Sequence, residues 1–517
     1  MDAKENKECL KDLRQTDPRD DKTRIEQTKG GLLRDSYCWI LDHADFQRWR
    51  DDPTCQLLWI KGDAGKGKTM LLCGIIDEME KLAAYRLTYF FCQATEAALR
   101  GATGVLRGLI YLLIVQQPCL ISYVREKYDH AGKQLFEDRN AWPALSGMLT
   151  AILNDPGLDN AVLIIDALDE CVDELPRLLN FIAEVSSLCR ARWIVSSRNW
   201  PSIEEKLGNT TQNVRLSLEL NESSISTAVQ TYIRYKVRLL AQQKRYDSAT
   251  RDAVEQHLVS SANGTFLWVA LVCQELADSK VRKRHTLAKL KSFPPGLDSL
   301  YQRMLEHICN SIDADLCKQI LAVVSVSYRP ITLIELRYLV EPLGTCDDND
   351  VEETIGSCGS LLTLRQGVIY LVHQSVKEFL VTKQFDKIFP CGIEGVHRSV
   401  SFRSLKVMSE TLRRDIYGLH NPCLHIQGIR APNPDPLAAV AYSCVYWADH
   451  IYNSSSDSKA MQEDVLQDGG AIHTFFKEKY IYWLEALSLL GSISKGVVAI
   501  QKLDSLLVGL NSLTASE

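Results

Sequence analysis

The sequence predicts an α/β fold built on a parallel five-stranded sheet, followed by a mostly helical second half. Three observations lead to this prediction. Between about residues 55 and 220, apolar runs alternate with helical patterns, as expected for a parallel sheet covered on both faces. A glycine-rich loop directly follows the first apolar run. Beyond residue 220, the apolar positions recur almost throughout at helical spacing.

The glycine-rich loop, residues 62–69, has the sequence Gly-Asp-Ala-Gly-Lys-Gly-Lys-Thr and fits the pattern G-x-x-x-x-G-K-[ST] at every fixed position. Its glycines leave out Cβ atoms that would block phosphates, and successive N–H groups form an anion nest where a helix begins. The alternative is a chance Gly/Lys loop before a helix. That alternative is disfavoured because strand, loop and helix follow in the required order.

This loop predicts binding of a nucleoside triphosphate or diphosphate. Lys68 supplies a mobile positive charge for the β- and γ-phosphates, and Thr69 offers its hydroxyl to Mg²⁺. The residues expected to bind the nucleotide are Gly62, Asp63, Ala64, Gly65, Lys66, Gly67, Lys68, Thr69 and Met70. No base-recognition motif such as N-K-x-D is evident, so the expected ligands are ATP/ADP or GTP/GDP with Mg²⁺.

Length and composition limit the classes of protein to consider. A chain of 517 residues exceeds one ordinary core, so about two to four domains are expected. Its 46% apolar and 24% charged residues are typical of a folded chain. The net charge of −6 gives no reason to expect a nucleic-acid partner, because such a partner needs a basic surface.

Targeting signals and cysteine usage predict a cytoplasmic protein. No apolar run reaches the ~18 residues that a membrane span needs, and the charged N-terminus lacks the apolar centre of a signal peptide. The 16 cysteines include no C-x-x-C pair, which argues for reduced thiols. His420, Cys423 and His425 have no fourth ligand at fixed spacing, so we expect no zinc site there.

The elements of the first half are expected in alternating order. Residues 1–54 predict a helical lead-in, with a helix at 9–13, a charged turn at 16–21 and amphipathic helices at 39–41 and 46–49. The expected strands are residues 57–60, 87–92, 161–165, 192–197 and 214–218. The expected helices are residues 71–82, 105–115, 121–128, 142–153 and 175–188. Ligands of parallel sheets bind at the carboxyl ends of the strands, where the loop, Asp166 and Arg198 all fall.

Asp166 ends the apolar strand at 161–165 and is the expected protein ligand of Mg²⁺, together with Thr69. A carboxylate at such a place needs a cation or water, and Mg²⁺ takes oxygen ligands while keeping several waters. Asp169 and Glu170 follow one turn later, where a carboxylate can orient the attacking water. Glu170 is the first choice for this base and Asp169 the second. The alternative is an acidic helix N-terminus stabilised by the helix dipole.

Arg198 ends the expected strand at 192–197. At this position its guanidinium can reach a γ-phosphate and report whether that phosphate is present, which makes it a third candidate catalytic residue. The alternative is an arginine that extends from a strand end into solvent.

Five stretches of the chain form one pattern. They are Thr-Asp-Pro-Arg-Asp-Asp-Lys at 16–22, Thr-Lys-Gly-Gly-Leu-Leu at 28–33, Leu-Trp-Ile-Lys-Gly-Asp at 58–63, Ile-Ile-Asp-Ala-Leu-Asp-Glu-Cys at 164–171 and Val-Ser-Ser-Arg at 195–198. Together they resemble a fungal NACHT-domain protein of the STAND class, the signalling P-loop NTPases related to animal inflammasome receptors. The small Ala167 and the Asp-Glu pair after it suit NACHT proteins better than helicases or transporters. The resemblance covers nearly the whole chain.

The resemblance implies a division into five parts. They are a helical lead-in at 1–54, the NACHT P-loop NTPase core at 55–220, a helical domain at 221–292, a winged-helix domain at 293–390 and a C-terminal helical domain at 391–517. Residues 262–270 resemble the Gly-led helix start that borders the nucleotide in STAND proteins, without its usual proline. A helix is expected to begin at 331–336, and Trp447 and Trp483 are expected in the core of the last part.

His373 is the last candidate site residue. Residues 361–364 and 368–373 look like the two strands of a winged-helix wing, joined by Arg-Gln-Gly. In the family a histidine at this place contacts the diphosphate of the resting state, which implies the same role for His373. The alternative is a histidine whose partner is Ser375 or the backbone.

Family members usually carry a C-terminal array of tryptophan–aspartate or ankyrin repeats that senses a ligand. No period of about 30–45 residues is present in this chain, and the first fifty-odd residues leave no room for an effector domain. The chain is therefore expected to be either a switch module without sensor and effector or a shortened form of a longer protein.

The resemblance implies a nucleotide-dependent signalling switch, active in fungal non-self recognition or programmed cell death, with protein partners or self-assembly on activation. Slow Mg²⁺-dependent hydrolysis of ATP or GTP would reset the switch. The alternative is a non-catalytic scaffold or interaction protein with a structurally bound nucleotide. A metabolic P-loop kinase or a helicase fits poorly, because neither a substrate-phosphoryl site nor a basic surface is evident.

Overall fold

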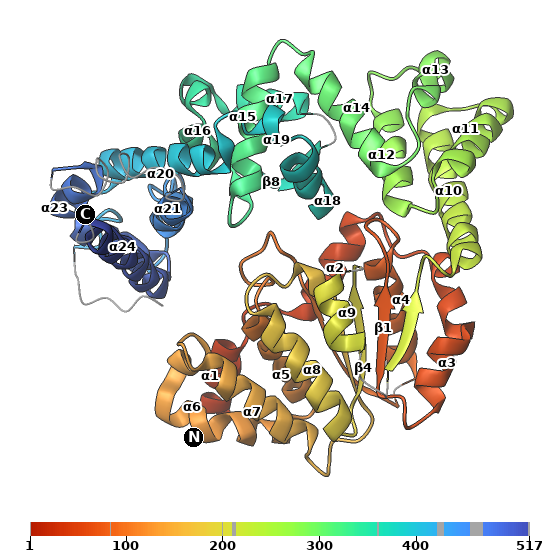
Figure 1. Cartoon of the computed structure of the whole chain (residues 1–517), viewed down its shortest axis with the longest axis horizontal. Coiled ribbons are helices and arrows are strands. Elements are labelled where there is room, and N and C mark those ends of the chain that lie inside the picture. Colours follow the sequence, from red (N-terminus) through yellow and green to blue (C-terminus); the bar gives the residue numbers. More distant parts are fainter. Residues whose placement is uncertain are drawn as a thin grey trace. The chain divides into compact units, whose positions relative to one another are not determined.

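The structure is a computed structural model that describes residues 2–82, 84–198, 200–208, 213–358, 361–420, 429–454 and 469–514 (Figure 1). It divides into two compact units, Met1–Leu300 and Tyr301–Glu517, and the boundary falls within helix α14 (Leu297–Cys309). The first unit holds the glycine-rich loop, the acidic residues and Arg198, whereas His373 lies in the second. The predicted division into five parts stays a prediction.

A parallel five-stranded sheet forms the centre of the first unit, as predicted. Its strands are β1 (Leu57–Lys61), β2 (Arg86–Phe91), β3 (Ala161–Asp166), β4 (Arg192–Ser197) and β5 (Asn213–Ser217). Their order across the sheet is β2-β3-β4-β1-β5, and every neighbouring pair is parallel. Since β4 separates β3 from β1, the end of β4 lies between Asp166 and the glycine-rich loop.

Helices surround this sheet and bury both of its faces (Figure 1). They are α1 (Asp2–Leu13), α2 (Pro18–Thr28), α3 (Ala44–Asp51), α4 (Lys68–Lys81), α5 (Ala102–Gln116), α6 (Ser122–Ala131), α7 (Ala141–Leu153), α8 (Leu175–Leu188), α9 (Pro201–Gly208), α10 (Glu222–Lys244), α11 (Ser248–Ser261), α12 (Phe266–Ala277) and α13 (Thr286–Lys291). All six residues of β3 are buried, which explains why its sequence is a continuous apolar run rather than an alternating one. Five predicted helices of this half correspond to α4, α5, α6, α7 and α8.

The charged turn predicted at 16–21 is wrong, because Pro18 begins helix α2. Asp17 is the N-cap, and its carboxylate accepts the N–H of Arg19 at 3.1 Å. Proline at the first helical position loses no hydrogen bond, and two acidic residues in the first turn face the positive end of the helix dipole. The amphipathic pair is a 3₁₀ turn, Cys38–Asp42, followed by α3.

The second unit begins with helices around a small antiparallel sheet. Its elements are α15 (Ala314–Val326), β6 (Ile331–Thr332), α16 (Leu333–Leu339), α17 (Asp348–Ser357), β7 (Leu362–Arg365), β8 (Val368–Leu371), α18 (Gln374–Glu378) and α19 (Phe385–Ile388). The strand order is β6-β8-β7, and Thr332 and Glu335 close a capping box where α16 starts. Gln366 and Gly367 turn the β7–β8 hairpin with positive φ, so the predicted hairpin is confirmed.

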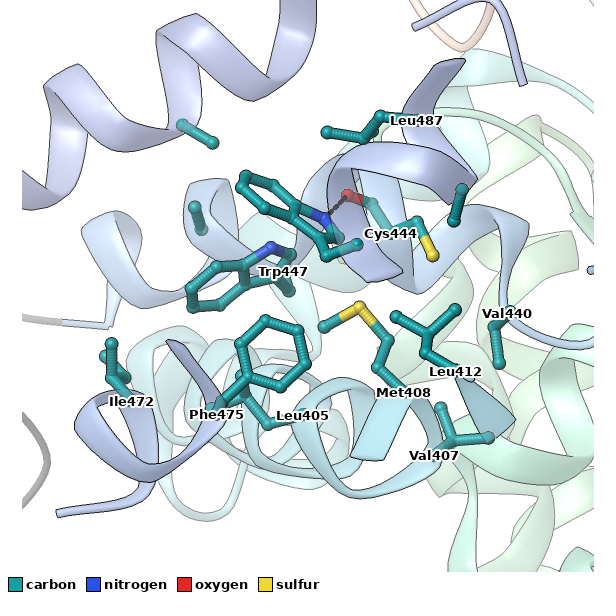
Figure 2. Close-up of a cluster of buried hydrophobic side chains, with 14 of the residues drawn as sticks. Leu405, Val407, Met408, Leu412, Val440, Cys444, Trp447, Ile472, Phe475 and Leu487 are labelled. Atoms are coloured by element: carbon teal, nitrogen blue, oxygen red, sulfur yellow. Dashed lines mark hydrogen bonds between the residues drawn. The ribbon is translucent and has the colours of Figure 1, made fainter. Parts of the chain in front are cut away.

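The last part of the second unit is helical, as predicted. Its described helices are α20 (Gly392–Thr411), α21 (Ala441–Asn453), α23 (Ala471–Leu489) and α24 (Ile493–Thr514). Trp447 and Trp483 are fully buried and meet edge to face with ring centroids 5.9 Å apart. The indole N–H of Trp483 donates to the carbonyl of Cys444 at 2.9 Å, within the apolar cluster shown in Figure 2.

Two expectations from composition concern the chain as a whole. Among the described residues, no helix is both long and apolar enough to cross a membrane. The cysteines within the described ranges are free thiols, mostly buried. Cys423 and His425 lie outside the described residues, so the structure does not bear on the expected absence of zinc there.

Candidate nucleotide-binding site

The glycine-rich loop joins β1 to α4 and has the backbone shape of a phosphate-binding loop. Gly65 and Gly67 have φ angles of 77° and 87°, in the left-handed region that residues with a Cβ rarely adopt. Gly67 is the N-cap of α4, and Lys68 and Thr69 are the first residues of that helix. The loop N–H groups therefore lie at the positive end of a 14-residue helix, as an anion site requires.

The three loop glycines are also required by packing against the protein itself. A Cβ on Gly62 would lie 3.0 Å from Leu218, and one on Gly65 would lie 2.8 Å from Thr265. A Cβ on Gly67 would lie 2.9 Å from the ring of Phe266. The sequence argument gave the phosphates as the reason for bare backbone, and the structure adds the neighbouring side chains.

Two of these neighbours belong to the start of α12, the segment expected to border the nucleotide. The Lys66 ammonium donates to the carbonyl of Asn263 at 3.1 Å, and the N–H of Leu267 donates to the carbonyl of Gly65 at 3.4 Å. The helix start thus contacts the phosphate loop directly, without the proline that is usual there.

Lys68 lies within the loop rather than in solvent. Its ammonium donates to the carbonyls of Gly62 at 2.5 Å and Asp63 at 3.0 Å. Burial lowers the pKa of this ammonium, and the nearby carboxylates of Asp169 and Asp166 oppose the shift. An anion in the loop would therefore be a better partner for Lys68 than the two neutral carbonyls.

Asp166 is only 2% exposed at the end of β3. Burial raises the pKa of its carboxyl, and hydrogen bonds from the hydroxyls of Ser196 and Thr69 act in the opposite direction. The Ser196 hydroxyl donates to Oδ1 at 2.6 Å. Thr69 and Asp166, the two expected Mg²⁺ ligands, are thus in contact, which fits a small cation that takes only one or two protein oxygens beside phosphates and water. In the part of the chain that the structure describes, no cluster of three His, Cys, Asp or Glu side chains offers a fuller metal cage.

Asp169 and Arg198 form a nearly buried ion pair. The guanidinium Nε of Arg198 lies 3.0 Å from Oδ2 of Asp169, and the backbone N–H of Arg198 donates to Oδ1 at 3.0 Å. Both oxygens of Asp169 are therefore engaged by the same residue. The structure thus gives Asp169 a role in holding Arg198, which leaves Glu170 as the better candidate for a base.

Glu170 lies at the end of the 3₁₀ turn Leu168–Glu170 and is only partly buried. Burial, with the nearby Asp169, raises the pKa of its carboxyl to about 7. The N–H of Ala94 donates to Oε2 at 3.3 Å. A carboxyl with a pKa near 7 can exchange a proton at neutral pH, as a general base must.

The remaining predicted residues have plainer surroundings. The N–H of Asp63 donates to Oε1 of Glu219 at 2.7 Å, and Ala64 and Met70 are half-buried beside the loop. In the second unit, His373 is the N-cap of α18, and its Nδ1 accepts the N–H of Ser375 at 3.1 Å. The alternative partner of this histidine is therefore present, while its role toward a diphosphate stays a prediction.

Three contacts at the site were missed from the sequence. Ser196 holds Asp166, Glu219 holds the loop at Asp63, and the N–H of Ala94 holds Glu170. Each joins residues at least 23 positions apart or depends on a backbone group, so no local pattern indicated them. The only available signal was the position of Ser196 and Glu219 near the carboxyl ends of expected strands.

Comparisons with known proteins agree with this architecture. The family model described as the N-terminal part of nephrocystin 3 matches residues 35–198. The vegetative incompatibility protein HET-E-1 of Podospora anserina is 55% identical over 515 residues, which cover 96% of this chain and 38% of that protein. The chain thus spans well under half of the length of this relative.

Similar solved structures include the Walker-type ATPase of Pyrococcus abyssi, with a TM-score of 0.33 and 11% identity over 68% of this chain and 96% of that one. Cdc6p from Pyrobaculum aerophilum has a TM-score of 0.32 and 13% identity over 69% of this chain and 96% of that one. The strongest relationship is therefore the one in sequence. The phosphate loop, the parallel sheet and the identity to HET-E-1 along almost the whole chain make this a HET-E-1-like protein of the fungal NACHT type.

Proposed function

We propose that the chain is a nucleotide-dependent switch that binds ATP or GTP with Mg²⁺, hydrolyses it slowly and thereby controls conformation and assembly. One observation supports this most directly. The carboxyl ends of β1, β3 and β4 bring the phosphate loop, Asp166, Glu170 and Arg198 to one edge of the sheet.

In this proposal the loop N–H groups and Lys68 bind the β- and γ-phosphates. Lys68 exchanges its two loop carbonyls for phosphate oxygens, which are charged and therefore stronger acceptors. Thr69 and Asp166 hold Mg²⁺, which when bound neutralises charge on the phosphate oxygens.

Glu170 accepts the proton of the attacking water. Because its pKa is about 7, a substantial fraction of this carboxyl is protonated at neutral pH, which favours slow turnover. Arg198 detects the γ-phosphate by leaving Asp169 for it, and His373 contacts the diphosphate in the resting state. By analogy with the name of HET-E-1, the switch acts in fungal non-self recognition, and it engages protein partners or further copies when activated.

Nucleotide titration of the purified protein tests the assignment of the loop. A ligand at 100 times its dissociation constant stabilises the folded state by about 2.7 kcal/mol, so wild type should melt at higher temperature with nucleotide and Mg²⁺. Lys68→Ala should lose this gain, whereas Lys81→Ala, at the far end of the same helix, should keep it. Equal binding by wild type and Lys68→Ala would overturn the assignment. The mass of any copurifying nucleotide would identify the base and the resting state.

A second candidate function is a non-catalytic scaffold with a structurally bound nucleotide. The hydrogen bond from Ala94 to Glu170 and the engagement of Asp169 by Arg198 favour it, because both candidate bases have partners already. Phosphate release separates the two candidates. Turnover in wild type that Glu170→Gln abolishes supports the switch with hydrolytic reset, and no turnover in either protein supports the scaffold.

A further inference from the structure

Ser196 lies at the centre of the site, on the strand between the phosphate loop and Asp166. Ile165 pairs with Val195 across β3 and β4, so the next residues of the two strands, Asp166 and Ser196, reach the same edge of the sheet. Ser196 is fully buried. Its hydroxyl donates to Oδ1 of Asp166 at 2.6 Å and accepts the N–H of Ala167 at 2.9 Å.

The direction of both hydrogen bonds is fixed by chemistry. A backbone N–H can only donate, so the Ser196 oxygen accepts from Ala167. The hydroxyl proton is then free to point only at the carboxylate of Asp166. A serine held from both sides in this way sets the rotation of that carboxylate, and the other contact of the carboxylate is the hydroxyl of Thr69.

The bond to Ala167 also fixes the turn after β3. Ala167 has a φ angle of 54°, in the left-handed region that a residue with a Cβ rarely adopts. This conformation directs the chain from β3 into the 3₁₀ turn that carries Asp169 and Glu170. One hydroxyl thus connects the orientation of Asp166 to the turn that places Glu170.

We propose that Ser196 is a positioning residue for the metal-dependent part of nucleotide binding. It touches neither nucleotide nor metal in this scheme, and it acts by orienting Asp166 toward the Mg²⁺ that Asp166 and Thr69 share. The inference rests on the proposed function. Side chains that orient a metal ligand typically change metal affinity about 10–100-fold when they are removed.

The test measures nucleotide affinity with Mg²⁺ and with a chelator instead, for wild type and two variants. Ser196→Ala should weaken Mg²⁺-dependent binding about tenfold or more and leave the weaker, Mg²⁺-free binding through Lys68 unchanged. Ser197→Ala is the matched control. Ser197 is equally buried, but its hydroxyl accepts from the indole of Trp59 and donates to the carbonyl of Arg198, without contact to Asp166.

The possible outcomes are distinct. If wild type does not bind nucleotide at all, the proposed function fails. If wild type binds with Mg²⁺ and Ser196→Ala binds equally well, only the inference about Ser196 fails. An equal loss of binding with and without Mg²⁺ in Ser196→Ala means a structural role and also overturns the inference.

A further variant keeps the test decisive if Ser196→Ala does not fold. Ser196→Cys keeps a side chain of similar shape but has only a weak donor. It should show the same selective loss of Mg²⁺-dependent affinity, to a smaller extent than Ser196→Ala. Unchanged Mg²⁺ dependence in a folded Ser196→Cys protein overturns the inference.

Discussion

Asp169 and Glu170 are neighbours in the chain, yet their carboxylates have different surroundings. Asp169 faces Arg198 with both of its oxygens, and Glu170 has a single backbone hydrogen bond and a pKa of about 7. The sequence ranked Glu170 before Asp169 as the base. The geometry supports that order, because an ion-paired carboxylate is a weaker proton acceptor.

At the residue scale, we expect Glu170→Gln to reduce phosphate release by about a hundredfold or more while nucleotide binding persists, because general bases contribute about 10²–10⁴-fold. Asp169→Asn should retain more turnover than Glu170→Gln, since it leaves the base in place. Single-turnover phosphate release with matched binding measurements checks both. The reverse ranking of the two variants would identify Asp169 as the base.

At the scale of elements, the phosphate loop and the start of α12 form one packed unit. Gly67 combines a φ angle of 87° with a close approach to Phe266. Any movement of the loop on binding phosphate therefore reaches α12 through direct contact. This contact is a physical route from the nucleotide to the helical segment.

The change Gly67→Ala should lower the stability of the first unit by about 1–2 kcal/mol, because a Cβ is strained in left-handed backbone. It should also weaken nucleotide binding. Gly147→Ala, on the exposed face of α7, is the control and should be neutral or stabilising by up to about 1 kcal/mol, because alanine favours a helix. Thermal unfolding of both variants measures the difference, and equal melting temperatures contradict the prediction.

A second feature at this scale is a buried histidine pair between α20 and α21. Nδ1 of His397 lies 2.7 Å from Nδ1 of His450, and Nε2 of His450 lies 2.7 Å from the hydroxyl of Tyr442. An N–H···N bond needs one donor and one acceptor, so a further proton on the pair breaks it. Burial lowers the pKa of His397 to about 4 and lowers that of His450 well below its usual value.

This pair predicts that the second unit is acid-sensitive. Both histidines have a lower pKa folded than unfolded, so their contribution is complete above about pH 6.5 and is lost as the pH falls toward 4. The loss is about 1.4 kcal/mol per pH unit for each histidine. Denaturant unfolding between pH 7 and 5 should show a shallower slope for His397→Leu/His450→Leu than for wild type. The exposed His420→Ala is the control, and a slope in the double variant as steep as in wild type contradicts the prediction.

At the scale of the whole molecule, the proposal requires that the nucleotide state changes assembly. We expect a non-hydrolysable triphosphate to give larger species in sedimentation than diphosphate does, because the γ-phosphate competes with Asp169 for Arg198. Arg198→Ala should bind both nucleotides and sediment alike in both. A nucleotide-dependent shift that persists in Arg198→Ala would assign the detection of the γ-phosphate to another residue.

The sequence by itself determined the features that are contiguous in the chain. Residues 62–69 specify the phosphate loop, and the apolar runs specify the strands because a parallel sheet buries both faces. It also placed Asp166, Glu170 and Arg198 at strand ends. The helix at Pro18 shows a local limit, since a charged stretch with an N-cap aspartate and a first-turn proline was taken for a turn.

Only the tertiary structure decided which of these residues act on one another. The strand order places Ser196 between Asp166 and the phosphate loop, and it pairs Asp169 with Arg198. The same holds for the histidine pair, whose members are 53 residues apart. Burial and charge pairing set hydrogen-bond partners and pKa values, and both depend on contacts between distant segments. A local pattern of residues carries no information about such contacts.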